Sequence, residues 1–184
     1  MTIRVLPETF EYVSFDSAYT ARIAERMAGL LGMDDVDITV DVVESSPLTR
    51  IDIEVSDGSV TIRPHSGAME DTRLPQQQSE LATTVTIARG LLKGRDRLRG
   101  GFSDAPADSE LSLAQVAAWD TYVMGRISRL DIKVIKQAWI YNFRNRHGFH
   151  DAADRVFEKI WSSDTLDWNA LDALSRSAGG ERGA

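Results

Sequence analysis

Histidine and carboxylate side chains that could bind a metal ion gather between residues 147 and 158. His147 and His150 are three positions apart, and carboxylates follow at Asp151, Asp154 and Glu158. On one continuous helix, residues three apart share a face, and imidazole nitrogens and carboxylate oxygens are ligands that zinc accepts. Such a site would belong to a metal-dependent hydrolase.

A glycine between the two histidines favours a different interpretation. Gly148 predicts the end of one helix, and Asp151 and Asp154 then lie in the first turn of the next, where carboxylates stabilise the positive end of the helix dipole. We therefore expect helix capping rather than metal binding, and His147 and His150 are kept as weak metal candidates. His65 follows a proline in a predicted loop, and we interpret it as a surface residue.

The segment Ser79-Glu80-Leu81-Ala82-Thr83 is similar to the H-E-x-x-H motif of zinc metallopeptidases with both histidines replaced. The expected order around it, a helix, a small antiparallel sheet and a second helix, is also the order in such peptidases. Without imidazoles at positions 79 and 83, Glu80 would have no metal-bound water to activate. One alternative is thus a metallopeptidase-like scaffold that lacks its metal ligands. We favour the simpler interpretation, in which Ser79 caps a helix and Glu80 lies in its first turn.

A basic segment stands out in a chain of net charge −7, because residues 71–100 hold six basic and three acidic residues. Its cations could bind the phosphates of a nucleic acid or another polyanion, and the anion-binding candidates are Arg89, Lys93, Arg95, Arg97 and Arg99. Cations near the carboxyl end of a helix also stabilise its dipole, by about 0.3–1 kcal/mol each. We favour this structural role and keep nucleic-acid binding as the alternative.

A second basic group extends from Arg126 to Arg146, across two predicted helices at 113–128 and 132–146. The second of these helices is apolar around most of its circumference, so we expect it to be the buried central helix of its lobe. A buried helix cannot lie in a major groove, and a DNA-reading helix-turn-helix is therefore rejected.

Four tryptophans lie in the last 66 residues. We expect most of them in the core, and Trp119, Trp161 and Trp168 are the candidates for anchoring a protein partner.

Composition excludes several functions. The chain of 184 residues has 42% hydrophobic and 27% charged residues and no cysteine, which excludes disulfides, thiolate zinc sites and iron–sulfur clusters. It has no apolar run of about 18 residues and no secretory signal pattern, so we expect a cytoplasmic protein that makes no membrane contact. Phosphate-loop and dinucleotide motifs are absent, and we expect neither a cofactor nor a catalytic residue. Abundant arginine favours a bacterial source.

The residue patterns that are typical of β-strands all lie in the first half of the chain. Ile51, Ile53 and Val55 alternate with polar residues, and so do Val60 and Ile62 after the turn Asp57-Gly58. This pattern predicts a hairpin that pairs Val55 with Val60, Ile53 with Ile62 and Asp52 with Arg63. Residues 36–43 predict a third strand, and the amino-terminal residues 3–7 and 10–15 one or two more.

These elements predict an α+β fold: a small antiparallel sheet of three or more strands with two helices, then an α-helical lobe of about four helices. The expected boundaries are an α+β lobe at 1–99, a linker at 100–110, a helical lobe at 111–177 and a flexible tail at 178–184. The preferred function is non-catalytic: contact with a protein partner, or self-association. Polyanion binding and metal-dependent hydrolysis remain the alternatives.

Overall fold

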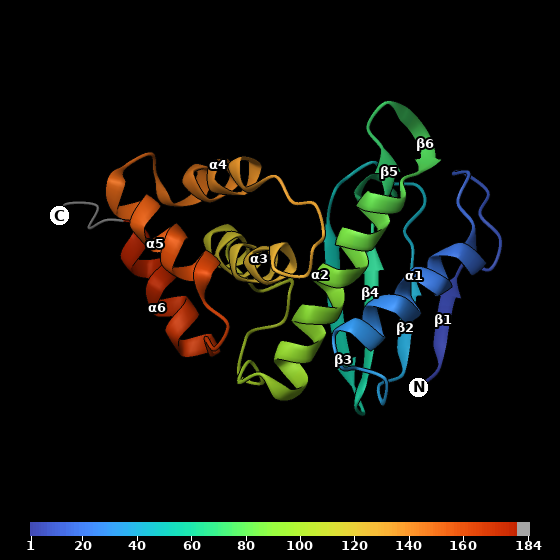
Figure 1. The fold of residues 1–184 in the computed structure, drawn as a ribbon, viewed down its shortest axis with the longest axis horizontal. Helices are drawn as coiled ribbons and strands as arrows, with labels where there is room; N and C mark the ends of the chain where they lie inside the picture. The colour runs from blue at the N-terminus through green and yellow to red at the C-terminus, as the bar shows by residue number, and fades with distance from the viewer. Residues whose placement is uncertain (180–184) are drawn as a thin grey trace. The chain divides into compact units, whose positions relative to one another are not determined.

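A computed structural model describes residues 1–179 and divides the chain into two units, Met1–Leu98 and Arg99–Ala184. The first unit contains the strands together with α1 and α2, and the second contains α3 to α6 (Figure 1). A mixed α and β fold followed by a helical region confirms the predicted fold class. None of the helices in residues 1–179 is long and apolar enough to cross a membrane.

The sheet of the first unit has four strands in the order β1-β2-β4-β3. The strands are β1 (Ile3–Leu6), β2 (Ile38–Asp41), β3 (Ile51–Ser56) and β4 (Ser59–Pro64). The antiparallel hairpin β3–β4 has the predicted register, with Val55 opposite Val60. Its turn has positive φ angles at Asp57 (50°) and Gly58 (76°), as a two-residue hairpin turn requires.

The direction of β2 differs from the prediction. We expected this strand to be antiparallel to its neighbours, and it is parallel to both β1 and β4. For β1 and β2 the reason is the connection through α1 (Ser17–Leu30), because a strand that follows such a crossover helix returns in the same direction. For β2 and β4 the reason is that β3 lies between them in sequence and runs antiparallel to β4. Residues 10–15 form no strand and contribute only the isolated bridge Ser14–Gln77.

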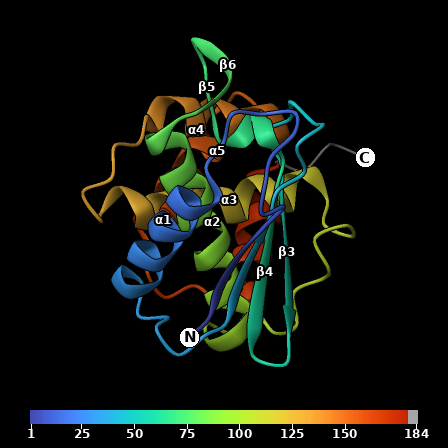
Figure 2. The ribbon, with the colours of Figure 1, turned by 90° about the vertical axis from the view of Figure 1, so that its right-hand side faces the viewer.

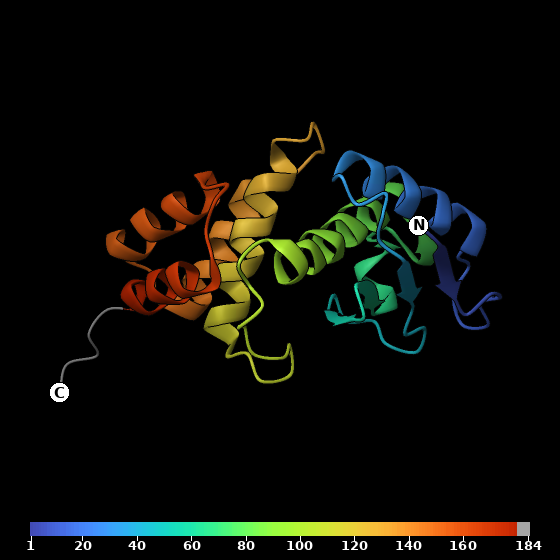
Figure 3. The same cartoon turned by 90° about the horizontal axis from the view of Figure 1, so that it is seen from below.

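Both helices of the first unit cover the same side of the sheet (Figures 2 and 3). Asp16 caps α1, with its Oδ1 accepting from Tyr19 N at 2.8 Å. The second helix, α2 (Glu80–Arg99), approaches β4 closely at Gly90 and Gly94. A Cβ atom at Gly94 would lie 2.7 Å from Val60 Cγ1, so only glycine fits this contact. A 3-10 turn (Ser66–Ala68) and the hairpin of β5 (Glu70–Asp71) and β6 (Leu74–Gln78) connect β4 to α2.

The second unit has four helices: α3 (Leu113–Ser128), α4 (Lys136–His147), α5 (Asp151–Ser162) and α6 (Trp168–Ala178). The predicted capping box is confirmed, since Ser112 Oγ accepts from Gln115 N and Gln115 Oε1 accepts from Ser112 N. The central helix is α3, which contacts the three others and is buried from Ala117 to Ile127. Phe102, in the segment predicted as a linker, is fully buried against Trp119.

The prediction that 132–146 forms the buried central helix is wrong. Asp131 has a φ of +59°, outside the right-handed helical region, and α4 begins only at Lys136. Within α4 only Phe143 and His147 are buried. Its other apolar side chains are half-buried or exposed, so the burial argument by which a DNA-reading helix-turn-helix was rejected does not hold. Of the predicted tail 178–184, Ala178 belongs to α6, and residues 180–184 lie outside the described part of the chain.

Candidate functional site

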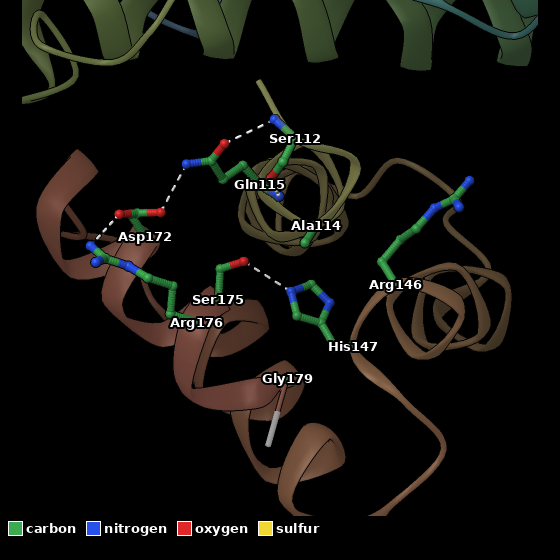
Figure 4. Close-up of a pocket in the computed structure, with 9 residues that line it drawn as sticks. All are labelled: Ser112, Ala114, Gln115, Arg146, His147, Asp172, Ser175, Arg176 and Gly179. Carbon is green, nitrogen blue, oxygen red and sulfur yellow. Dashed lines mark hydrogen bonds and ion pairs between the residues drawn. The ribbon is translucent and has the colours of Figure 1, made fainter. Parts of the chain in front are cut away.

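A pocket of about 410 Å³ opens in the second unit between the start of α3, the end of α4 and the end of α6 (Figure 4). Its polar lining comes from residues far apart in sequence: Gln115, Arg146, His147, Asp172, Ser175 and Arg176. The volume lies within the range of pockets that hold small molecules. It is therefore a candidate site for a small ligand.

His147 and Ser175 form the polar floor of this pocket, and both are buried. His147 Nε2 lies 2.9 Å from Ser175 Oγ, and His147 Nδ1 lies 3.1 Å from the carbonyl oxygen of Phe143. Burial lowers the pKa of the imidazole below its usual value, and the hydrogen bond with Phe143 opposes this shift only in part. The ring is therefore neutral near pH 7.

The left side of the pocket in Figure 4 is a connected network. Gln115 Nε2 donates to Asp172 Oδ1 at 2.9 Å, and Arg176 forms an ion pair with the other carboxylate oxygen of Asp172. Gln115 also holds the cap of α3 through its own carbonyl oxygen. The network therefore ties α6 to the first turn of α3 and fixes one wall of the pocket.

The two histidines predicted as weak metal ligands have separate roles. His150 caps α5, with Nδ1 accepting from Ala153 N at 3.2 Å, while both ring nitrogens of His147 are engaged as described above. Asp151 and Asp154 lie in the first turn of α5, as the capping interpretation predicted. Asp154 also pairs with Arg144 at 2.7 Å, and this hydrogen bond lowers the pKa of the Asp154 carboxyl. Within residues 1–179, no group of three or more histidine, aspartate or glutamate side chains could hold a metal ion.

The basic side chains of α2 do not form a row of fully solvated cations. Lys93 is buried, and Arg95 Nη1 donates to Leu31 O at 2.9 Å. Arg89 and Arg97 are half-buried, and Arg99 is exposed. Anion binding by these five residues stays a prediction.

At the start of the same helix, the predicted cap is present, since Ala82 N donates to Ser79 Oγ at 3.2 Å and Glu80 lies in the first turn.

The three tryptophans proposed as partner anchors are buried, with exposed fractions of 0% for Trp119, 8% for Trp161 and 7% for Trp168. Trp119 and Trp168 pack with Phe102 in one aromatic cluster. Trp161 packs on Phe157 in another. A partner could reach these rings only if the second unit opened.

This chain was compared with protein-family models, with curated proteins and with solved structures. No family model, curated protein or solved structure matches it. Its function must therefore be argued from the geometry alone.

His65 has partners that its sequence position did not reveal. Its Nδ1 lies 2.6 Å from Ser46 Oγ, and its Nε2 lies 4.0 Å from Asp52 Oδ2. These are the residue types of a hydrolytic triad, but Asp52 is held by Arg50 through three hydrogen bonds of 2.8–3.0 Å. The Ser46 carbonyl also accepts from Ser66 Oγ, so the contacts hold the 46–50 loop against the end of β4. We assign this trio a structural role.

Three of the four large apolar residues that are exposed in the second unit's described part lie on and beside α4, and the fourth, Leu113 (62% exposed), begins α3. Ile135, Tyr141 and Phe149 expose 66%, 58% and 62% of their surface, and Ala138 is exposed between them. Tyr141 and Phe149 meet edge to face with ring centroids 5.7 Å apart. The sequence prediction of a buried helix at 132–146 placed Ile135, Ala138 and Tyr141 in the core, because an apolar composition does not tell which side of a helix meets its neighbours. We call Ile135, Ala138, Tyr141 and Phe149 the α4 face.

Proposed function

We propose that the chain is a non-catalytic binding protein that acts through protein–protein contact, with the α4 face as its binding surface and a second copy of the chain as the partner. The observation that carries the proposal is an apolar and aromatic face left open on a helix that is otherwise anchored. The absence of cysteine and the arginine-rich composition support a bacterial, cytoplasmic setting.

The apolar character of the α4 face supports contact with protein. Ile135, Ala138 and Tyr141 are three positions apart, which places them on the side of α4 away from the buried Phe143 and His147. Phe149 follows the end of α4 and joins this side through its contact with Tyr141. Exposed contiguous apolar patches are uncommon on monomers and mark interaction sites, and aromatic side chains are enriched at protein interfaces. The Tyr141–Phe149 contact also holds the two rings in a fixed arrangement, which reduces the entropy lost on binding.

The charge around the α4 face supports an acidic partner. Residues 132–150 contain four lysines and arginines and no carboxylate. Lys136 pairs with Glu158 and Arg144 with Asp154, whereas Lys133 and Arg146 have no ion pair within residues 1–179. Two unpaired cations thus flank the apolar side chains.

A second copy of the chain supplies the complementary charge. Residues 1–70 contain thirteen acidic and five basic residues, so each copy carries both an acidic unit and the basic surroundings of the α4 face. A symmetric contact of α4 with α4 would bring like charges together, and like-charge contacts across an interface are costly. We therefore expect the α4 face of one copy to bind the acidic first unit of another.

Sedimentation of the wild type and a double variant tests this proposal. Tyr141→Ser with Phe149→Ser removes two aromatic rings that are both more than half exposed, so folding should persist while the sedimentation coefficient falls to that of a monomer. The matched control is Leu113→Ser, which removes another exposed apolar side chain (62% exposed) from the second unit, outside both the α4 face and the acidic first unit.

The control should sediment like the wild type. Association that survives the double variant would contradict the use of the α4 face. A wild-type chain that remains monomeric but binds duplex or single-stranded DNA would favour the polyanion alternative instead.

A further inference from the structure

The acidic first unit has two surfaces where carboxylates border exposed apolar side chains. One lies at the end of α1, around Leu30, with the carboxylates of Asp34, Asp35 and Asp37. The other lies around Tyr12, with the carboxylates of Glu8, Glu11 and Glu44. Either could complement the cations beside the α4 face of another copy. The charge that each surface keeps after its internal contacts decides between them.

Positive groups offset the carboxylates at the end of α1. Asp37 Oδ1 accepts from Thr2 N at 2.6 Å and lies 3.9 Å from the amino terminus of the chain. Arg95 Nη1 donates to Leu31 O at 2.9 Å, so a guanidinium also lies at this end. A further cation from a partner would be repelled by these two charges.

The carboxylates around Tyr12 keep their charge. Glu8 and Glu11 are exposed, and neither has an ion pair within residues 1–179. Glu44 Oε2 accepts from the backbone nitrogens of Glu11 and Tyr12 at 2.7 and 2.9 Å, and these donors are neutral. Residues 5–21 contain no lysine or arginine. This surface is therefore the better complement for cations.

The loop that carries Tyr12 is held in place while the tyrosine side chain remains exposed. Glu44 binds its backbone, Phe10 meets Phe15 edge to face with ring centroids 5.6 Å apart, and Ser14 N donates to Gln76 O at 2.8 Å. The Tyr12 side chain is nevertheless 64% exposed. An exposed aromatic side chain on a fixed backbone loses little conformational entropy when a partner covers it.

The strand β6 extends this surface. Ser14 and Gln77 form a parallel bridge, and Tyr12 and Leu74 lie two and three positions before it, so both lie on the same side of the bridge along the chain. Leu74 is 60% exposed, and the β5–β6 hairpin extends beyond the rest of the first unit (Figure 2). Arg73 is the one cation in residues 70–78, and the two carboxylates of β5 outnumber it.

We propose that this surface of one copy binds the α4 face of another, and we call Tyr12, Leu74, Glu8, Glu11 and Glu44 the Tyr12 surface. Its two apolar side chains pack against the aromatic rings of the α4 face, and its carboxylates face the two unpaired cations beside them. The inference rests on the proposed function, because it names the place where the α4 face contacts the second copy. The two surfaces differ, so each copy contributes a different half to the contact.

Sedimentation of a second double variant tests this pairing. Tyr12→Ser with Leu74→Ser should raise the dissociation constant about tenfold or more, because both apolar side chains of the Tyr12 surface are removed. The matched control is Leu30→Ser, which removes an exposed apolar side chain (51% exposed) from the competing surface of the same unit. The control should sediment like the wild type.

Mixing the two double variants tests whether the contact joins different surfaces. The Tyr12→Ser, Leu74→Ser variant keeps its α4 face, and the Tyr141→Ser, Phe149→Ser variant keeps its Tyr12 surface. Each variant alone should be a monomer. An equimolar mixture should form a dimer, because one intact half comes from each partner.

A charge variant covers the case in which the loss of Tyr12 or Leu74 unfolds the chain. Glu8→Lys with Glu11→Lys changes two exposed side chains that have no ion pair within residues 1–179. It should raise the dissociation constant about tenfold at low salt, and the effect should shrink in about 0.5 M salt, where the charges are screened. An unchanged dissociation constant would overturn the inference.

The remaining outcomes separate this inference from the proposed function. Wild-type association that is lost without the α4 rings but persists in the Tyr12→Ser, Leu74→Ser variant would overturn the inference and leave the proposed function intact. A mixture of the two variants that stays monomeric, or an equal loss in Leu30→Ser, would do the same. A monomeric wild type would overturn both.

Discussion

His147 shows how a residue can be recognised in sequence while its partner in the fold cannot be. Its spacing from His150 suggested a shared ligand, and the break at Gly148 indicated correctly that the two belong to different elements. The sequence contained no signal for Ser175, which lies 28 positions away and reaches His147 only because α4 and α6 pack together. A contact between helices depends on their packing, and spacing along the chain cannot report it.

The burial of His147 makes stability depend on pH. Because the folded pKa is lowered, the unfolded chain binds more protons below its own pKa of about 6.5, and the free energy of unfolding falls as pH drops through that range. His147→Gln removes this titration. We expect urea unfolding at about pH 7.5 and about pH 5.5 to show a larger loss of stability for the wild type than for the variant.

Other groups titrate in both the wild type and the variant, and Asp154 is one of them. Because the pKa of Asp154 is lowered in the folded state, the stability that its carboxylate contributes is lost in acid. The difference between the two proteins therefore isolates His147. Equal losses would show that its protonation is not coupled to folding.

At the scale of elements, patterns that rest on neighbouring residues were predictable. The β3–β4 register followed from alternation and the Asp57-Gly58 turn, and the capping box of α3 followed from Ser112 and Gln115. Features that rest on distant residues were not predictable. The parallel direction of β2 depends on its long connection to β1, and the exposure of α4 depends on which helix occupies the centre of the second unit. Alanines and a glycine let α3 take that position, because small side chains allow close helix contacts.

Gly125 is the closest of these contacts and carries a prediction. A Cβ atom there would lie 2.1 Å from Trp161 O, and this neighbour is backbone that cannot rotate away. Gly125→Ala should therefore destabilise the fold by about 2 kcal/mol or more, measured by chemical denaturation.

The matched control is Gly29→Ala in α1, where the nearest atom would be 3.4 Å away and alanine is the better helix former. This control should be neutral or should stabilise by about 0.5–1 kcal/mol. A tolerated Gly125→Ala would mean that α3 and α5 are farther apart than described.

At the scale of the whole molecule, charge is the feature that connects sequence to function. Net charge alone indicated an acidic protein, but its acidic excess lies in residues 1–70, and its carboxylate-free stretch lies at 132–150. The sequence showed both regions. It could not show that α4 exposes apolar side chains between its cations, and that exposure is what changes a basic segment into a candidate protein-binding surface.

The central claim is that copies of the chain associate through opposite charge and an apolar α4 face. Light scattering of the wild type over a range of salt concentrations tests it most directly. At low salt we predict a concentration-dependent mass above the 20.4 kDa of one chain, falling toward that value as salt screens the charges. A mass of 20.4 kDa at every protein and salt concentration would contradict the account.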